Sequence, residues 1–177
     1  NIVPGGTSTS INIDNDFTIT SGTFNCSNKD IIIKGNYSNS GTFTNNSKTV
    51  TFAATDAGNT LAGTLSGTSK FYNLIFNGVA GAWSFTSNPA VEVANDLTIT
   101  NGTVTSTSGN LTVTGNYSNA GTFTHNSGTV IFNATDAGNT LAGTLSGSSS
   151  FYNLSFSGAA GAWSFTSNPA VTVTNAL

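Results

Sequence analysis

The sequence predicts an all-β fold, a parallel β-helix in which about 20 residues form each coil. Two observations predict it. Residues 11–90 and 91–170 match at 53 of 80 positions without a gap, and short runs that alternate apolar with small polar residues fill both copies. No window shows apolar residues at helical spacing. We therefore expect one continuous solenoid over residues 1–177, with sequence repeats at 11–90 and 91–170 and a partial third repeat at 171–177.

Each strand is predicted from its alternation and from the turn residues that bound it. In the second copy the alternating runs are 97–100, 111–114, 152–156, 163–166 and 171–174. Pairs such as Asn101-Gly102 and Ser127-Gly128 lie between these runs and tolerate a positive φ. The turns divide the 80-residue repeat into four coils of similar length, which are 91–110, 111–128, 129–150 and 151–170.

Stacking these four coils predicts two columns of inward side chains. The first column is Val93, Val113, Phe132 and Phe156. The second column is Val104, Phe123, Leu141 and Phe165. Successive coils would pair in parallel at about 4.8 Å along the axis, so a copy of four coils would have an axial repeat near ~19 Å. A β-sandwich is the competing fold, because turns every 8–12 residues also suit it. The absence of a linker between the copies and the shortness of the strands favour the solenoid.

Three stretches of the second copy carry a resemblance to a known family. They are LTVTGNYSNAGTFT at 111–124, GTVIFN at 128–133 and FYNL at 151–154. They resemble the tandem β-solenoid repeats of very large bacterial surface proteins, and the resemblance covers nearly the whole chain. It implies a right-handed parallel β-helix in a secreted or surface-anchored fibre, stalk or adhesin of a prokaryote. The motifs of that family specify a coil and not a chemistry, so the resemblance implies no functional residue.

Composition indicates a structural, extracellular protein. Charged residues make up 6% of the chain, against about a quarter in ordinary soluble proteins. The net charge is −3 with four basic residues, so we expect neither nucleic acid nor an anionic membrane as a partner. No apolar run approaches the length that spans a bilayer, and we expect no membrane insertion. Cys26 is the one cysteine and corresponds to Ser106, which rules out an internal disulfide.

Candidate catalytic residues are few, and their pattern predicts that the protein is not an enzyme. Asp16 recurs as Asp96, and Asp56 recurs as Asp136, each in a turn where an aspartate commonly bonds its own backbone. His125 has no counterpart in the first copy, so a Ser-His-Asp site there would exist once. Neither zinc nor calcium spacing is present, and we expect no metal and no cofactor.

Two surface features keep alternative functions open. Trp83, Trp163, Tyr72 and Tyr152 could form a platform for a glycan, as in an adhesin stalk, although the alternation of Trp163 with Phe165 indicates an interior position. Paired threonines at 103–105 and 122–124 would point outward, as in the ladders of some ice-binding solenoids. The next coil offers Thr140 with Ala142, which would interrupt such a ladder, and ordinary β-propensity explains the threonines without ice.

Both ends of a solenoid expose unpaired backbone groups, and no capping element is evident at either end of the sequence. We therefore predict end-to-end self-association, or covalent continuation into further repeats, within an extracellular or cell-surface filament. The apolar residues at the two ends form the predicted axial interface: Ile11, Ile13, Phe17, Ile19, Val171, Val173 and Leu177.

Overall fold

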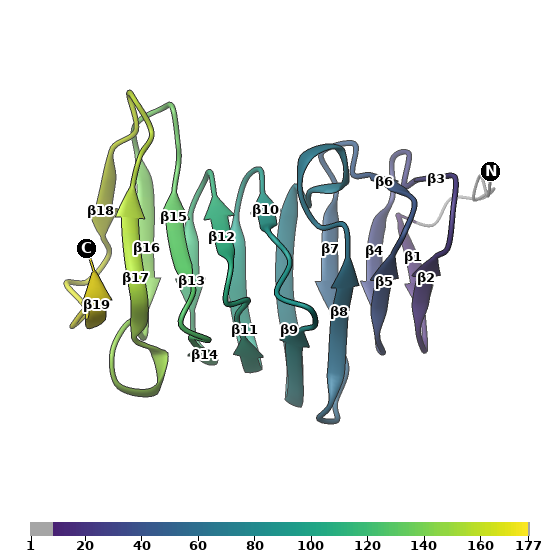
Figure 1. Cartoon of the computed structure of the whole chain (residues 1–177), viewed down its shortest axis with the longest axis horizontal. Helices are drawn as coiled ribbons and strands as arrows, with labels where there is room; N and C mark the ends of the chain where they lie inside the picture. The colour runs from purple at the N-terminus through teal and green to yellow at the C-terminus, as the bar shows by residue number, and fades with distance from the viewer. Residues whose placement is uncertain (1–8, 177) are drawn as a thin grey trace.

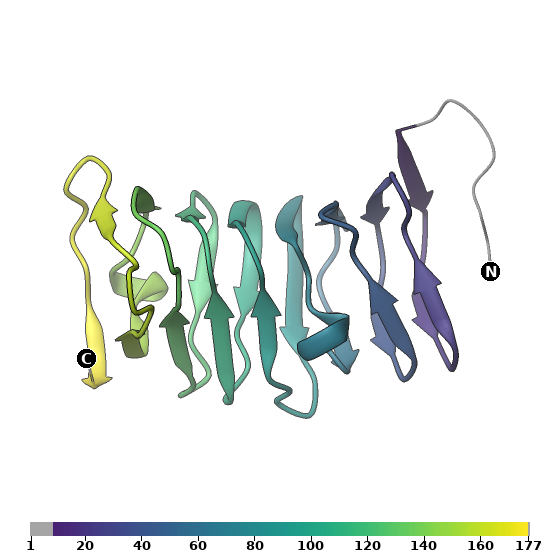
Figure 2. The same ribbon diagram turned by 90° about the horizontal axis from the view of Figure 1, so that it is seen from above.

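A computed structural model, which describes residues 9–176, shows a parallel β-solenoid of about eight turns. Each turn contains about 21 residues, and helix is almost absent. The turns stack along the long axis of the molecule, with β1 (Ser10–Ile13) at one end and β19 (Val173–Ala176) at the other (Figures 1 and 2). The predicted all-β architecture with parallel stacked coils is therefore confirmed.

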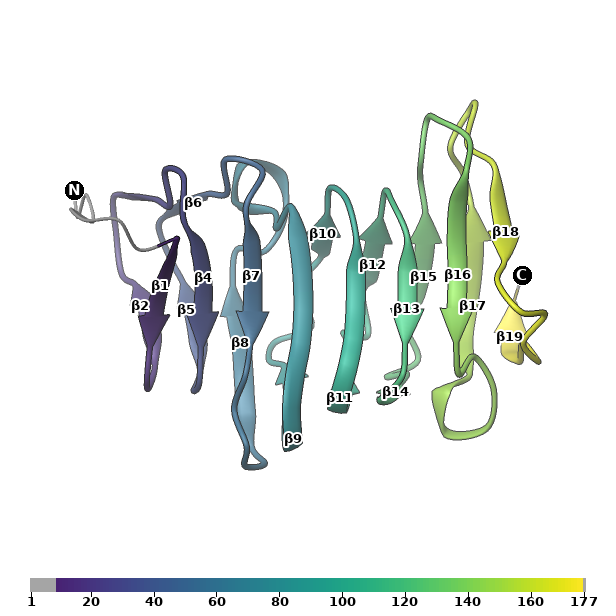
Figure 3. The same cartoon turned by 180° about the vertical axis from the view of Figure 1, so that it is seen from behind.

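Three faces make up each turn, and successive strands on a face pair in parallel. The first face is visible as a row in Figure 3. It contains β1, β4 (Asp30–Ile33), β7 (Thr49–Phe52), the first half of β9 (Asn73–Phe85), the first half of β11 (Leu97–Thr105), β13 (Tyr117–Asn119), β16 (Asn139–Gly143) and β18 (Trp163–Phe165).

The second face shares β9 and β11 with the first, because these two long strands continue around the corner. It contains β2 (Phe17–Ile19), β5 (Tyr37–Asn39), β8 (Asn59–Gly63), the second halves of β9 and β11, β14 (Thr122–Thr124) and the short 3-10 turn η2 (Gly147–Ser149). The shared strands join both faces into one 12-stranded sheet.

The third face begins with a pair of strands and continues, after a 3-10 turn, as a five-stranded sheet. It contains β3 (Thr23–Asn25), β6 (Thr42–Thr44), η1 (Gly67–Ser69), β10 (Val91–Val93), β12 (Asn110–Val113), β15 (Thr129–Phe132) and β17 (Phe151–Phe156). β19 also pairs with β17, but its chain enters beside η2 at the end of the second face, where Val171 bridges Leu145 and Val173 pairs with Phe151.

Alternation along each strand sends apolar side chains inward, where they form one continuous cluster from Ile19 to Leu154. The predicted column of Val93, Val113, Phe132 and Phe156 is confirmed by the register of β10, β12, β15 and β17. The second predicted column is wrong at one step. Phe123 does pair with Val104 and Leu141 with Phe165, but Leu141 follows Tyr117 on the first face. The sequence order placed Phe123 and Leu141 in succession, whereas the chain turns a corner between them.

Equivalent residues of the two copies lie on different faces. Ile11 is on the first face and its equivalent Val91 is on the third. Phe17 is on the second face, while its equivalent Leu97 pairs with strands of the first. The cause is the number of segments: β1 to β8, η1 and the two halves of β9 give eleven face segments per copy. Eleven segments on three faces make three turns and two-thirds, slightly fewer than the four coils predicted for 80 residues.

Candidate functional site

The predicted axial interface divides between the two ends of the solenoid. Ile11 and Ile13 are half-buried on β1, Phe17 is half-buried on β2, and Ile19 is buried beside it. Val171 and Val173 belong to the last turn, where Val171 is exposed and Val173 is half-buried. Leu177 lies outside the described residues. These two groups are at opposite ends of the molecule, so they could meet only between two molecules (Figure 1).

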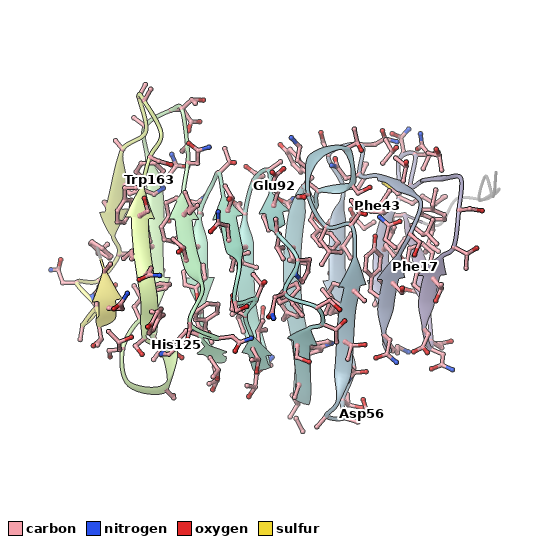
Figure 4. The ribbon with its side chains drawn as sticks, in the orientation of Figure 1. Phe17, Phe43, Asp56, Glu92, His125 and Trp163 are labelled. Atoms are coloured by element: carbon pink, nitrogen blue, oxygen red, sulfur yellow. The ribbon has the colours of Figure 1, made fainter. Side chains whose placement is uncertain are left out.

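Exposed large apolar side chains gather at the C-terminal end. Among the described residues four such side chains are exposed, and three of them are in the last turns: Phe156 at 41%, Phe165 at 41% and Val171 at 37%. The fourth, Val79, lies in the middle of β9. Trp163 is half-buried in the same end turn as Phe165 and is labelled in Figure 4.

The equivalent residues of the first copy show how exposure changes when another turn covers these side chains. Phe76, Phe85 and Val91 are the equivalents of Phe156, Phe165 and Val171, and their exposed fractions are 1%, 6% and 0%. Residues at the start of the second copy cover them, because β11 stacks on β9 and β12 stacks on β10. The exposure of the C-terminal set therefore follows from its position at the end of the stack and not from its sequence.

The N-terminal end is also apolar within the described residues. Phe17 and Phe24 lie edge to face with ring centroids 4.8 Å apart. A shallow hollow of about 230 Å³ opens beside them, and its lining runs from Phe17 to Phe24. Behind this layer, Phe24 stacks on Phe43 and Phe17 contacts Tyr37 in the next turn. Figure 4 labels Phe17 and Phe43 in this end of the molecule.

Three aromatic residues of these ends were missing from the predicted interface. Phe156 and Phe165 were expected in interior columns, and Phe24 was not singled out. The identity of residues 80–91 and 160–171 could have signalled Phe165, because a repeated sequence at the edge of an array keeps its apolar side chains without the turn that buries them.

Two of the recurring aspartates, Asp16 and Asp96, hold successive turns together and do so through the next turn, not through their own backbone as expected. Asp16 Oδ1 accepts hydrogen bonds from the backbone N–H and side-chain amide of Asn36 in the next turn, at 2.8 and 2.9 Å. Asp96 does the same for Asn116. Asp56 lies in a loop tip, visible at the edge of the molecule in Figure 4. There its Oδ1 accepts a hydrogen bond from the Asn59 side chain of the same loop at 3.1 Å. The carboxylates of Asp16 and Asp96 therefore tie successive turns, whereas that of Asp56 bonds within its own loop.

His125, the one histidine, lies beside Tyr152. His125 Nδ1 accepts a long bond of 3.4 Å from the Ser127 N–H, and its ring lies 5.4 Å from that of Tyr152. Across residues 9–176 no group of three or more His, Cys, Asp and Glu is arranged to hold a metal ion. None of the helical segments in the described part of the chain is long and apolar enough to cross a membrane.

Cys26 is buried and chemically quiet. Its Sγ donates to the carbonyl oxygen of Asn45 at 2.7 Å. Burial raises the pKa of the Cys26 thiol to about 11, so the thiolate that would act as a nucleophile or metal ligand is scarce at neutral pH.

The threonine pairs form a shorter ladder than an extended ice-binding surface would need. Thr103 pairs with Thr122 and Thr105 with Thr124. The preceding turn places Ala82 and Ser84 in these positions, and the following turn on this face is η2. Thr140 and Ala142, expected to be next in this ladder, are on the first face beside Asn116 and Ser118. The double-threonine ladder therefore spans two turns.

Comparisons with known proteins add no family to this geometry. No family model matches the chain, and neither a curated protein nor a solved structure matches it.

Proposed function

We propose that the chain is a structural element of an extracellular or cell-surface filament, in which solenoid turns stack along one axis. The observation that carries the proposal is the contrast between the two copies. Phe85 is buried under the next turn, whereas Phe165, in the same sequence context, is exposed at the C-terminal end. An apolar end with unpaired strand edges is stabilised when another turn covers it.

The charge distribution is compatible with stacking. All four lysines are in the first copy, where four aspartates balance them, and the second copy has three carboxylates and no lysine. The end of the second copy therefore meets a first copy with no net charge, and like-charge repulsion across the joint is small. The sparse charge and the abundance of Thr, Ser and Asn support the surface location.

Electron microscopy of the purified chain tests the filament. We expect rods at high protein concentration, and we expect Phe165→Asp to abolish them by placing a carboxylate in the apolar joint. Ser164→Asp is the matched control, because it adds the same charge to the neighbouring, outward-facing position of β18. Discrete particles from the unmodified chain, or rods that survive Phe165→Asp, would contradict the proposal.

The surface location has a separate test. Antibodies raised against the purified chain should label intact cells of the source organism without permeabilisation. Labelling that appears only after the cells are opened would place the filament inside and overturn this part of the proposal.

A further inference from the structure

The last described segment, Val171–Ala176, is held on the second copy by a specific set of contacts. The Thr172 N–H donates to the carbonyl oxygen of Leu145 at 3.0 Å, and the Phe151 N–H donates to the carbonyl oxygen of Thr172 at 2.9 Å. The Asn175 side chain donates to Asn153 Oδ1 at 2.7 Å. This segment, which we term the tail, therefore lies in a defined register on β17.

Residues 91–96 make the same contacts on the first copy. The Glu92 N–H donates to the carbonyl oxygen of Leu65 at 3.0 Å, and the Phe71 N–H donates to the carbonyl oxygen of Glu92 at 3.0 Å. The Asn95 side chain donates to Asn73 Oδ1 at 2.8 Å. The tail thus occupies the position that the start of a further copy would take.

The tail is the weaker occupant of that position. Glu92 accepts a hydrogen bond from the Gly67 N–H at 2.9 Å through its carboxylate, whereas Thr172 has no carboxylate. Asp96 binds Asn116 of the next turn, whereas Ala176 has no polar side chain.

The first turn offers a second segment with this pattern. Ile11 and Ile13 correspond to Val91 and Val93, and their register with β4 directs them inward. Asp16 keeps the carboxylate that Ala176 lacks and binds Asn36 of its own next turn. Residues 11–16 of one molecule therefore match the position that the tail fills on another.

We infer that the tail occupies an acceptor site for residues 11–16 of a second copy of this chain, and that end-to-end growth proceeds by exchange of the two segments. This inference rests on the proposed filament and specifies its joint. The incoming segment would bond to Leu145 and Phe151 in place of the tail, with hydrogen bonds exchanged and no covalent bond changed. Phe24 of the incoming molecule would then lie over Trp163, as Val104 lies over Trp83 within the chain.

The exchange fixes the geometry of the filament. Position 11 of one molecule would coincide with position 171 of its neighbour, which is two copies, or twenty-two face segments, along the chain. Twenty-two segments are seven turns and one-third, so each molecule would add about 35 Å along the axis and rotate by about 120°. Stacking of the eight turns without exchange would instead add about 38 Å with no such rotation.

Helical reconstruction from electron micrographs of the unmodified chain distinguishes the two joints. A rise near ~35 Å with a rotation near ~120° is expected from the exchanged segments. Rods with a rise near ~38 Å and no one-third rotation would overturn the exchange and leave the filament standing. Absence of rods would overturn the filament itself.

Two full-length variants test the tail directly by the rate of rod growth in light scattering. Val171→Ser with Val173→Ser loosens the tail and should speed growth several-fold, whereas Thr172→Glu supplies the carboxylate that Glu92 presents to the Gly67 N–H and should slow it. Val79→Ser is the matched control, because Val79 is 73% exposed and remote from both ends. If growth stops when the tail is loosened, the tail itself forms the joint. If growth is unchanged in both variants, the tail plays no part in growth. Either result overturns the inference.

A synthetic peptide spanning residues 10–20 provides a test that does not require rods. It should bind the chain with the loosened tail more tightly than the unmodified chain, as measured by fluorescence anisotropy. A peptide with Ile11→Ser and Ile13→Ser should bind neither. Equal binding to both chains would overturn the inference even if filaments form.

Discussion

Phe85 and Phe165 lie in identical local sequences, but the fold gives them different surroundings. Phe85 is buried beneath the second copy, whereas Phe165 is at the open end. We expect Phe85→Ala to reduce the free energy of unfolding by about 3–5 kcal/mol, the cost of a large cavity in a core. Phe165→Ala should cost below about 1.5 kcal/mol in the monomer, because much of its side chain is already in water. Urea unfolding of dilute protein measures both, and equal losses would contradict the assignment.

Cys26 gives a prediction about pH. Burial raises its pKa to about 11, so in mildly alkaline solution the thiol stays neutral in the folded protein, whereas the thiol of the unfolded chain ionises near ~8.5. The stability linked to this thiol is fully present below the unfolded pKa, and it is lost as the pH rises toward about 11. Replacing Cys26 by Ser, the residue that the second copy has at 106, should remove this loss.

The measurement is the free energy of unfolding of both proteins at pH 7 and across the alkaline range. Buried Ser106 shows that a hydroxyl fits the equivalent position, where its N–H bonds Thr124 as the Cys26 N–H bonds Thr44. The two proteins should therefore differ little at pH 7, and Cys26→Ser should lose less stability as the pH is raised. Parallel losses in both would contradict the role of burial.

Two asparagines at corners of the solenoid, Asn36 and Asn116, join successive turns through their side chains. Asn116 donates to Asp96 in the preceding turn, and its Oδ1 accepts from the Thr140 N–H and hydroxyl in the following turn, both at 2.9 Å. Asn36 makes the same set of bonds in the first copy, with Asp16 and Thr60. One side chain thus fixes the spacing of three turns at a corner where the backbone leaves the sheet.

Replacing Asn116 by Ala should therefore destabilise the solenoid by about 2–3 kcal/mol, since three side-chain hydrogen bonds are lost and the Thr140 N–H loses its acceptor. Asn133→Ala is the control, because Asn133 is exposed, accepts one long bond of 3.4 Å from Ser157, and is replaced by Ala53 in the first copy. The control should change the stability by less than about 0.5 kcal/mol. Chemical denaturation measures both, and a neutral Asn116→Ala would refute the role of the corner.

At the scale of the molecule, the strands of each described turn pair only with those of the turns beside it, so stability should vary along the axis. Central strands such as β9 and β11 have a turn on both sides. We expect their amide hydrogens to exchange slowest, and those of β1 and β19 to exchange fastest. Hydrogen exchange followed by mass spectrometry measures this gradient in the monomer, and uniform protection from end to end would contradict it.

The strands and most of the inward residues could be predicted from the sequence, because the side-chain period of a strand is read directly from neighbouring residues. The column from Val93 to Phe156 is an example. The step from Phe123 to Leu141 could not be predicted in this way. Turn residues mark where the chain bends but not through what angle, so they leave open which strand begins a new turn.

The ends of the molecule show the same limit. The sequence alone identified apolar residues such as Ile11 and Val171 at the two termini of the repeat pattern, but it could not separate Phe165 from Phe85, because their local sequences are identical. Burial depends on the turn that stacks above a residue, which is a relation between segments about 20 residues apart.

By itself, then, the sequence determined the repeating strands, the parallel solenoid and the low content of charged residues. Only the tertiary structure decided that eleven segments on three faces rotate each copy by one-third of a turn, and that the tail occupies the place of a further copy. The physical reason is that strand formation is a local property of alternation, whereas the angle at each corner and the cover over each turn arise from packing between turns.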